Sequence, residues 1–190
     1  ALGSQLVRPP IPGCAEQTFD VDTYRGAVKL NDHLRGLSGR PKAPGLFTAV
    51  VVGAGLTGIE TACELPARLR AIMARAVVHQ PVRVILADHN PLIGSDMGAS
   101  ARPVIEEALN ALGIEQRMGV KIAAITPEGV KLDTGEEIAA ATVIWCAGIR
   151  ANPLTRCFGV ELDRLGRIPV DEFLRIQGSA NAFAAGDSAV

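Results

Sequence analysis

The sequence has few aromatic residues, no marked excess of either charge and no hydrophobic run long enough to cross a bilayer. Aromatic residues make up 4% of its 190 residues, and 19 Lys and Arg are balanced by 20 Asp and Glu. The net charge of -1 provides no basic field that would attract nucleic acid or anionic lipid. No segment reaches the roughly 18 apolar residues of a membrane span, and the first residues show no secretory signal pattern. We therefore expect a cytoplasmic protein with no nucleic-acid partner and no membrane contact through this chain.

The chain also lacks the cysteine and histidine spacing of disulfide-built or zinc-binding folds. None of its four cysteines forms a Cys-x-x-Cys pair, and 48% hydrophobic residues suffice to bury a core without crosslinks. The histidines show no zinc-ligand spacing relative to the cysteines. We expect reduced thiols and no metal site. The residues concerned are Cys14, Cys63, Cys146 and Cys157 together with His33, His79 and His89.

Hydrophobic patterning predicts buried parallel strands that alternate with helices, because short β-branched runs are separated by apolar residues at helical spacing. Pro66, inside one such helical pattern, predicts a kink or a break there. Residues 120–138 instead form short runs divided by Pro-Glu-Gly and Asp-Thr-Gly, which are hairpin signals. We expect an α/β fold, with a Rossmann-like parallel sheet, helices on both of its faces and a small antiparallel meander. The expected strands are 46–52, 82–87, 114–118 and 142–147, and the expected helices are 18–37, 59–76 and 103–112.

The glycines that follow the first expected strand form a Gly-x-Gly-x-x-Gly sequence between a strand and a helix. Gly53 permits the tight turn, Gly55 leaves room for a pyrophosphate beside the backbone, and Gly58 lets the helix approach the strand. Free N–H groups at the helix start, where Leu56 and Thr57 stand, would hold the anion. A dinucleotide site is the economical explanation, and a glycine-rich turn without a ligand is the alternative.

Asp88 stands at the end of the second expected strand, where a dinucleotide fold places the acidic residue that accepts hydrogen bonds from the adenosine ribose. It lies thirty residues after Gly58, which is a longer separation than usual. The residues that follow, 89–91, offer no Arg or Lys for a 2′-phosphate, so the sequence favours NAD(H) over NADP(H). A solvated turn aspartate is the alternative interpretation.

Three ordered segments give the chain a resemblance to the pyridine nucleotide-disulfide oxidoreductase superfamily, over nearly its whole length. Residues 1–4 with 8–13 resemble the segment that leaves the flavin domain, although Leu2 replaces the usual Thr. Residues 146–148 resemble the turn beneath the nicotinamide cofactor, and 181–187 resemble the late flavin motif. The resemblance implies contacts to NAD from Ala147 and Gly148, and contacts to FAD in a longer parent protein from Gly3, Ser4, Gly186 and Asp187.

Within this superfamily, residues 57–60, 143–149 and 166–171 look most like type II NADH dehydrogenases. That likeness implies that NADH gives hydride to FAD and that two electrons pass on to a quinone. A flavoprotein reductase of a protein acceptor, such as ferredoxin, rubredoxin or nitrite reductase, is one alternative. A non-catalytic NADH-sensing module is another, although the sequence shows no DNA-binding or partner-binding element. The sequence leaves two questions open for the parent protein: whether it forms a homodimer, and whether it lies peripherally on the cytoplasmic face of the membrane.

The resemblance divides the chain between two cofactor-binding regions. Residues 13–154 correspond to a glutathione-reductase-like NAD(H)-binding domain, and residues 1–12 and 155–190 to the edges of an incomplete FAD-binding domain. Hydride chemistry belongs to the cofactors, whereas the protein orients them. Because half of the orienting frame is missing, we expect this chain to bind NADH, but not to hold FAD tightly or to turn over alone.

Glu60 has two interpretations. The resemblance places its carboxylate beside the stacked nicotinamide and flavin, where it could orient the ring or relay protons as a catalytic group. The alternative is a first-turn glutamate that the helix dipole stabilises.

Cys146 lies in the turn under the cofactor. A role as a small buried residue explains a cysteine at this position better than redox chemistry does.

Overall fold

The computed structural model describes residues 2–76, 80–95 and 97–190, so His79 lies outside the described residues. The chain divides into two compact units, which are described separately below. The larger unit is Arg8–Ala147, and the smaller unit combines Ala1–Val7 with Gly148–Val190. Among the described residues, no helix has the length and apolar character needed to cross a membrane.

A four-stranded parallel sheet forms the centre of the larger unit, with strand order β4-β3-β2-β8. All five residues of the central strand β2 are buried, which explains its continuous β-branched and small apolar sequence. The register aligns the carboxyl ends of the strands at one edge of the sheet, where Val52 lies beside both Ala87 and Trp145. The strands are β2 (Thr48–Val52), β3 (Arg83–Asp88), β4 (Glu115–Met118) and β8 (Thr142–Trp145), close to the predicted ranges.

Three helices accompany the sheet, and their ends follow local signals. The Thr23 side chain caps the first helix by accepting a hydrogen bond from the Gly26 N–H, and Gly113 ends the last one with a left-handed φ of 72°. Pro66 lies within the second helix, which continues without a break. Of the two expectations, the break is therefore wrong, because buried residues on both sides of Pro66 hold the helix against the core, whereas the kink stays a prediction. The helices are α2 (Tyr24–Gly36), α3 (Leu56–Met73) and α4 (Arg102–Leu112).

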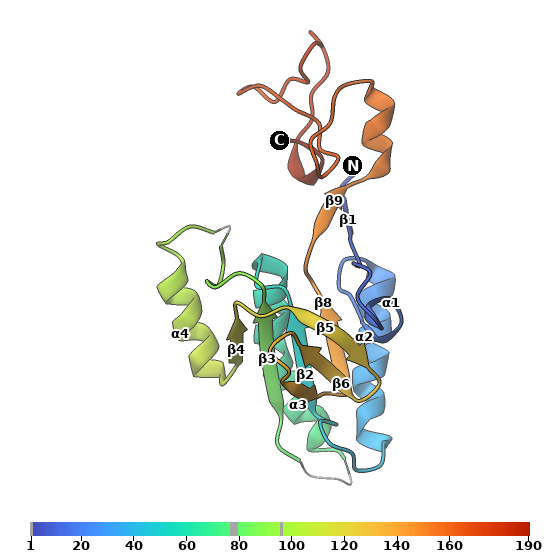
Figure 1. Cartoon of the computed structure of the whole chain (residues 1–190), viewed down its shortest axis with the longest axis vertical. Helices are drawn as coiled ribbons and strands as arrows, with labels where there is room; N and C mark the ends of the chain where they lie inside the picture. The colour runs from blue at the N-terminus through green and yellow to red at the C-terminus, as the bar shows by residue number, and fades with distance from the viewer. Residues whose placement is uncertain (1, 77–79, 96) are drawn as a thin grey trace. The chain divides into compact units, whose positions relative to one another are not determined.

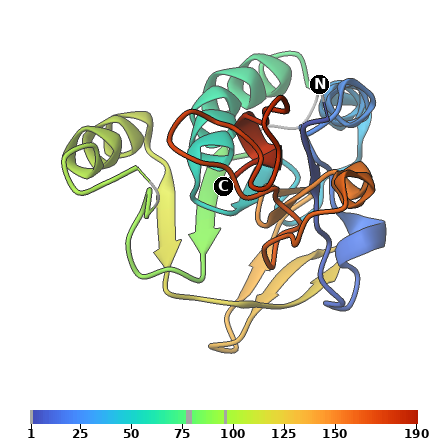
Figure 2. The same ribbon diagram turned by 90° about the horizontal axis from the view of Figure 1, so that it is seen from above.

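The two faces of the sheet are covered by different kinds of structure. Leu34, Leu69 and Leu109, one from each long helix, belong to a single core cluster with Val51 and Leu86 of the sheet. Figures 1 and 2 show the antiparallel meander on the opposite face from α2 and α3. The predicted Rossmann-like class is confirmed with one difference, since the meander occupies the second face where helices were also expected. The meander consists of β5 (Ile122–Thr126), β6 (Gly129–Leu132) and β7 (Glu137–Ala139).

Short elements complete both units. The larger unit begins with α1 (Cys14–Gln17), and η1 (Leu37–Gly39) follows α2. In the smaller unit β1 (Ser4–Leu6) pairs antiparallel with β9 (Ile149–Ala151), and η2 (Pro153–Phe158) and η3 (Gly186–Ser188) follow. Its apolar core is small, because few of its described hydrophobic residues are buried. These are Ala151, Ile168 and Ile176.

Candidate functional site

The glycine loop joins the end of β2 to the start of α3. Gly53 has a φ of 109°, and a Cβ added there would lie 2.8 Å from the Ala147 backbone nitrogen. Gly55 is the N-cap of α3, with extended backbone and no side chain to bond the first-turn N–H groups. The first-turn amides of α3 are therefore free of a side-chain cap, as an anion-binding helix start requires.

Gly58 lies on the first turn of α3 against the loop. A Cβ at this position would lie 1.8 Å from the Gly53 carbonyl oxygen, which is closer than any side chain could tolerate. The predicted close approach of helix and strand at Gly58 is thus present in the structure. Leu56 and Thr57, which precede it, are exposed at the start of the same helix.

Asp88 ends β3 and binds the glycine loop directly. Its Oδ2 accepts a hydrogen bond from the Ala54 N–H at 2.5 Å, and its Oδ1 accepts one from the Asn90 N–H at 2.7 Å. The His89 ring nitrogen Nδ1 lies 3.2 Å from the same Oδ1. Only 8% of Asp88 is exposed, so it is a buried structural carboxylate rather than a solvated turn residue. The Oδ2 atom, which among the described residues accepts a hydrogen bond from the Ala54 N–H alone, has a second lone pair with which it can accept a further donor.

A cleft of about 400 Å³ opens at the carboxyl ends of β2, β3 and β8. It lies where the strand order reverses, since β3 and β4 follow on one side of β2 and β8 lies on the other. Open parallel sheets bind ligands at such a position. We call it the strand-end cleft. Its lining residues are Pro9, Ile11, Val52, Gly53, Ala87, Asp88, His89, Val120, Lys121, Ile122, Trp145 and Ala147.

Sequence reasoning identified Gly53, Asp88 and Ala147 but missed other lining residues of the cleft. Val120 donates its N–H to the Asp88 carbonyl at 3.0 Å, which brings the segment after β4 to the end of β3. Trp145 is buried at the end of β8, and its indole N–H donates to the Ala147 carbonyl at 2.7 Å. Their positions in the sequence could have indicated this role, because both residues stand at or just beyond the carboxyl ends of predicted strands.

Glu60 lies exposed in the second turn of α3. No acidic residue occupies the first turn of that helix, so the interpretation of Glu60 as a first-turn glutamate is wrong. The helix dipole acts mainly on the first turn, which leaves this carboxylate with little stabilisation from it.

The thiols of the larger unit are poor candidates for redox chemistry. Burial raises the pKa of Cys146 to about 11, and burial also raises the pKa values of Cys14 and Cys63. A thiol with a raised pKa is a weak nucleophile at neutral pH, because the thiolate is the reactive form. Across the part of the chain that the structure describes, no cluster of His, Cys, Asp and Glu could hold a metal ion.

The residues that resemble flavin contacts come together within the smaller unit. The Ser4 hydroxyl donates to Asp187 Oδ2 at 2.7 Å, although 183 positions separate the two residues. The Gly3 carbonyl accepts a hydrogen bond from the Asn152 N–H at 3.3 Å. Gly186 precedes Asp187 in η3. Gly148, which resembles a contact to NAD, has a φ of 74° and accepts a hydrogen bond from the Val7 N–H.

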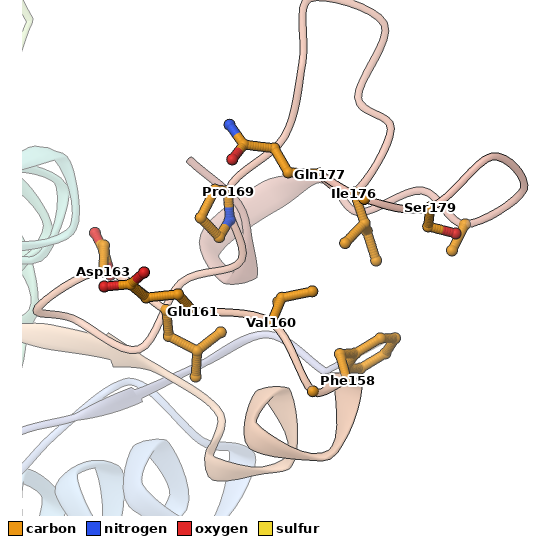
Figure 3. A pocket seen from close by; sticks show the side chains of 12 residues that line it. Phe158, Val160, Glu161, Asp163, Pro169, Ile176, Gln177 and Ser179 are labelled. Carbon is orange, nitrogen blue, oxygen red and sulfur yellow. The ribbon is translucent and has the colours of Figure 1, made fainter.

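A larger hollow of about 740 Å³ lies among the loops of the smaller unit (Figure 3). The Phe158, Val160 and Ile176 side chains line it together with polar groups. Its Asp163 carboxylate is already bound by the Arg167 guanidinium at 2.7 Å and by two backbone N–H groups. None of the predicted site residues lines this hollow, so size alone does not make it the functional site.

The whole chain, residues 1–190, matches the family described as pyridine nucleotide-disulphide oxidoreductase. This chain belongs to that family. Its glycine loop, Asp88 and strand-end cleft are therefore features of a pyridine nucleotide-disulphide oxidoreductase chain.

Two proteins of Mycobacterium tuberculosis are similar in sequence to this chain. The NADH dehydrogenase-like protein Rv1812c of Mycobacterium tuberculosis is 60% identical over 189 residues, which cover 100% of this chain and 47% of that protein. The type II NADH:quinone oxidoreductase NdhA of the same organism is 34% identical over 153 residues, covering 74% of this chain and 33% of NdhA. The chain thus spans less than half the length of these relatives.

A solved structure supports the fold assignment. NDH2 from Plasmodium falciparum, in complex with NADH, superimposes with a TM-score of 0.72 at 16% identity. The match covers 98% of this chain and 42% of NDH2. The superposition shows a shared fold and, at this low identity, the fold alone; it agrees with the Rossmann-like sheet and meander described above.

Proposed function

We propose that this chain is the NADH-binding portion of an FAD-dependent NADH dehydrogenase that passes electrons to a quinone. The observation that carries the proposal is the Asp88 carboxylate bonded to the Ala54 N–H, because it joins the ribose-binding position to the glycine loop. The relatives named as an NADH dehydrogenase-like protein and a type II NADH:quinone oxidoreductase favour this activity.

In this proposal the first-turn amides of α3 bind the pyrophosphate of NADH, with Gly55 leaving space beside the backbone. Asp88 accepts hydrogen bonds from the adenosine ribose and so favours NADH over NADPH. Ala147 and Gly148 pass beneath the cofactor, Leu56 and Thr57 stand at the anion-binding helix start, and Glu60 orients the nicotinamide end. The protein's part in the reaction is to hold the dinucleotide in one position and orientation.

The domain assignment belongs to the same proposal. Residues 13–154 form the NAD(H)-binding domain, and residues 1–12 and 155–190 form edges of an FAD-binding domain. Ser4 and Asp187 offer a paired hydroxyl and carboxylate that fit polar groups of FAD. FAD, when bound in the longer protein, supplies the acceptor for the hydride of NADH.

An NADH titration of the purified chain tests the proposal. Trp145 is the only tryptophan and lines the strand-end cleft, so its fluorescence should be quenched in a saturable way as NADH binds. Gly55→Val should weaken binding by at least about 100-fold, because the side chain fills the space that the pyrophosphate needs. The matched control is Gly39→Val, at a position with open space around it, which should bind like the wild type.

The thermal unfolding midpoint of each variant shows whether it is folded. A folded Gly55→Val protein that binds NADH with unchanged affinity would remove the glycine loop from the site. Absence of any saturable response in the wild-type chain would reject the proposed function itself.

A further inference from the structure

Lys121 is brought to the strand-end cleft by a segment far from Asp88 in sequence. The Gly119 N–H donates to the Asn90 carbonyl at 2.9 Å, and the adjacent Val120 N–H donates to the Asp88 carbonyl at 3.0 Å. These two bonds fasten the chain before Lys121 to the end of β3. Lys121 and Asp88 therefore line one cleft, although residues 89–91, which directly follow Asp88, contain no Arg or Lys.

The backbone of Lys121 is fixed on its other side as well. Its N–H donates to Asp133 Oδ1 at 3.0 Å, and its carbonyl accepts from the Asp133 N–H at 2.8 Å. The backbone of Lys121 is thus fixed between the end of β3 and the turn after β6. This backbone is ordered before a ligand binds, whereas the exposed Lys121 side chain is held by no ion pair among the described residues.

The Lys121 ammonium is available for a ligand. Within residues 2–76, 80–95 and 97–190, no carboxylate forms an ion pair with it, and the side chain is exposed. Lys131, by contrast, pairs with Glu137 at 3.1 Å. The cleft therefore carries one buried carboxylate, already bonded to the backbone, and one unpaired cation at its rim.

We propose that Lys121 is a specificity-determining residue that supplies the positive charge for a 2′-phosphate on the adenosine ribose, and that Asp88 masks this capacity. The inference rests on the proposed dinucleotide site. Asp88 repels a 2′-phosphate by like charge, whereas Lys121 attracts it. Removing the charge of Asp88 alone should then admit NADPH without any new basic residue.

The test compares the wild type, Asp88→Asn, Lys121→Met and the double variant, with NADH and NADPH as probes and Trp145 fluorescence as the signal. Asp88→Asn should raise NADPH affinity relative to NADH by about tenfold. Adding Lys121→Met should remove about fivefold of the NADPH affinity and much less of the NADH affinity. The NADPH affinity of Asp88→Asn should also fall with added salt, and the double variant should lose most of this dependence.

Lys131→Met is the matched control, because it removes one lysine charge from β6 outside the cleft. In the Asp88→Asn background it should leave the ratio of the two affinities unchanged. If Asp88→Asn does not fold, Lys121→Glu in the wild-type chain should lower NADPH binding more than NADH binding. Equal NADPH affinity with and without Lys121 would overturn the proposal, whereas a wild type that binds no NADH would reject the dinucleotide site instead.

Discussion

At the scale of single residues, Gly58 is constrained more tightly than Gly53 of the same loop. A Cβ there meets the Gly53 carbonyl oxygen at 1.8 Å, so Gly58→Ala must push α3 away from the loop. We expect a loss of roughly 1–3 kcal/mol in the free energy of unfolding, measured by urea denaturation, together with weaker NADH binding. Gly36→Ala, in a helix with open space around it, should be neutral or slightly stabilising. Equal stability of the two variants would contradict the close approach.

His33 makes stability depend on pH. Burial, followed by the neighbouring Arg40 guanidinium, lowers its pKa to about 4. Arg40 donates to Nδ1 at 3.3 Å, so the neutral ring places its proton on Nε2, which lies 3.0 Å from the Thr142 hydroxyl. The unfolded chain takes up a proton near its ordinary pKa of about 6.5. Folding stability is therefore complete above about pH 6.5 and falls as the pH drops toward about 4.

The size of this effect is about 1–3 kcal/mol after allowance for partial solvent screening of the ring. His33→Gln keeps an amide in the place of the ring and has no group that titrates in this range. Urea denaturation at about pH 7.5 and about pH 5 should show a smaller pH-dependent loss of stability in the variant than in the wild type. Identical losses in both proteins would mean that His33 does not titrate as described.

At the scale of elements, the sequence predicts strands and turns better than it predicts which segments meet. The glycine loop could be located because Gly53 and Gly55 stand between a strand and a helix, and the end of α4 could be located because Gly113 follows it. Lys121 could not be placed in the cleft, because its position depends on Val120 bonding to the end of β3. Burial also overrode local propensity at Pro66, where α3 continues.

The sequence also does not show which face of the parallel sheet each segment covers. The meander, and not further helices, lies on the second face. The crossovers from β2 to β3 and from β3 to β4 run in one direction across the sheet, and right-handed crossovers in one direction place their helices on one face. The second face is then left for another apolar surface, which the meander provides through buried residues such as Ile125 and Leu132. Periodicity alone does not reveal the direction of each crossover, and it therefore predicts helices without assigning them to one face of the sheet.

At the scale of the whole molecule, the two units differ in how much apolar surface they bury. Nearly all the buried hydrophobic side chains among the described residues belong to the larger unit. The smaller unit instead exposes many large apolar side chains for its size. These are Ile149, Leu154, Phe158, Phe173, Leu174, Phe183 and Val190. Burial of apolar area is the main favourable term in folding, so the larger unit should account for most of the stability of the chain.

This imbalance predicts that the larger unit folds and binds NADH without most of the smaller one. A shortened chain of residues 8–150 keeps the glycine loop, Asp88, the strand-end cleft and Gly148. It should unfold in one cooperative thermal transition and bind NADH within about twofold of the full chain, measured by Trp145 fluorescence. A shortened chain that unfolds without cooperativity would show that the smaller unit supports the sheet. One that folds but loses NADH would place part of the binding surface in the residues removed, because the structural features that hold the dinucleotide in the proposal all remain.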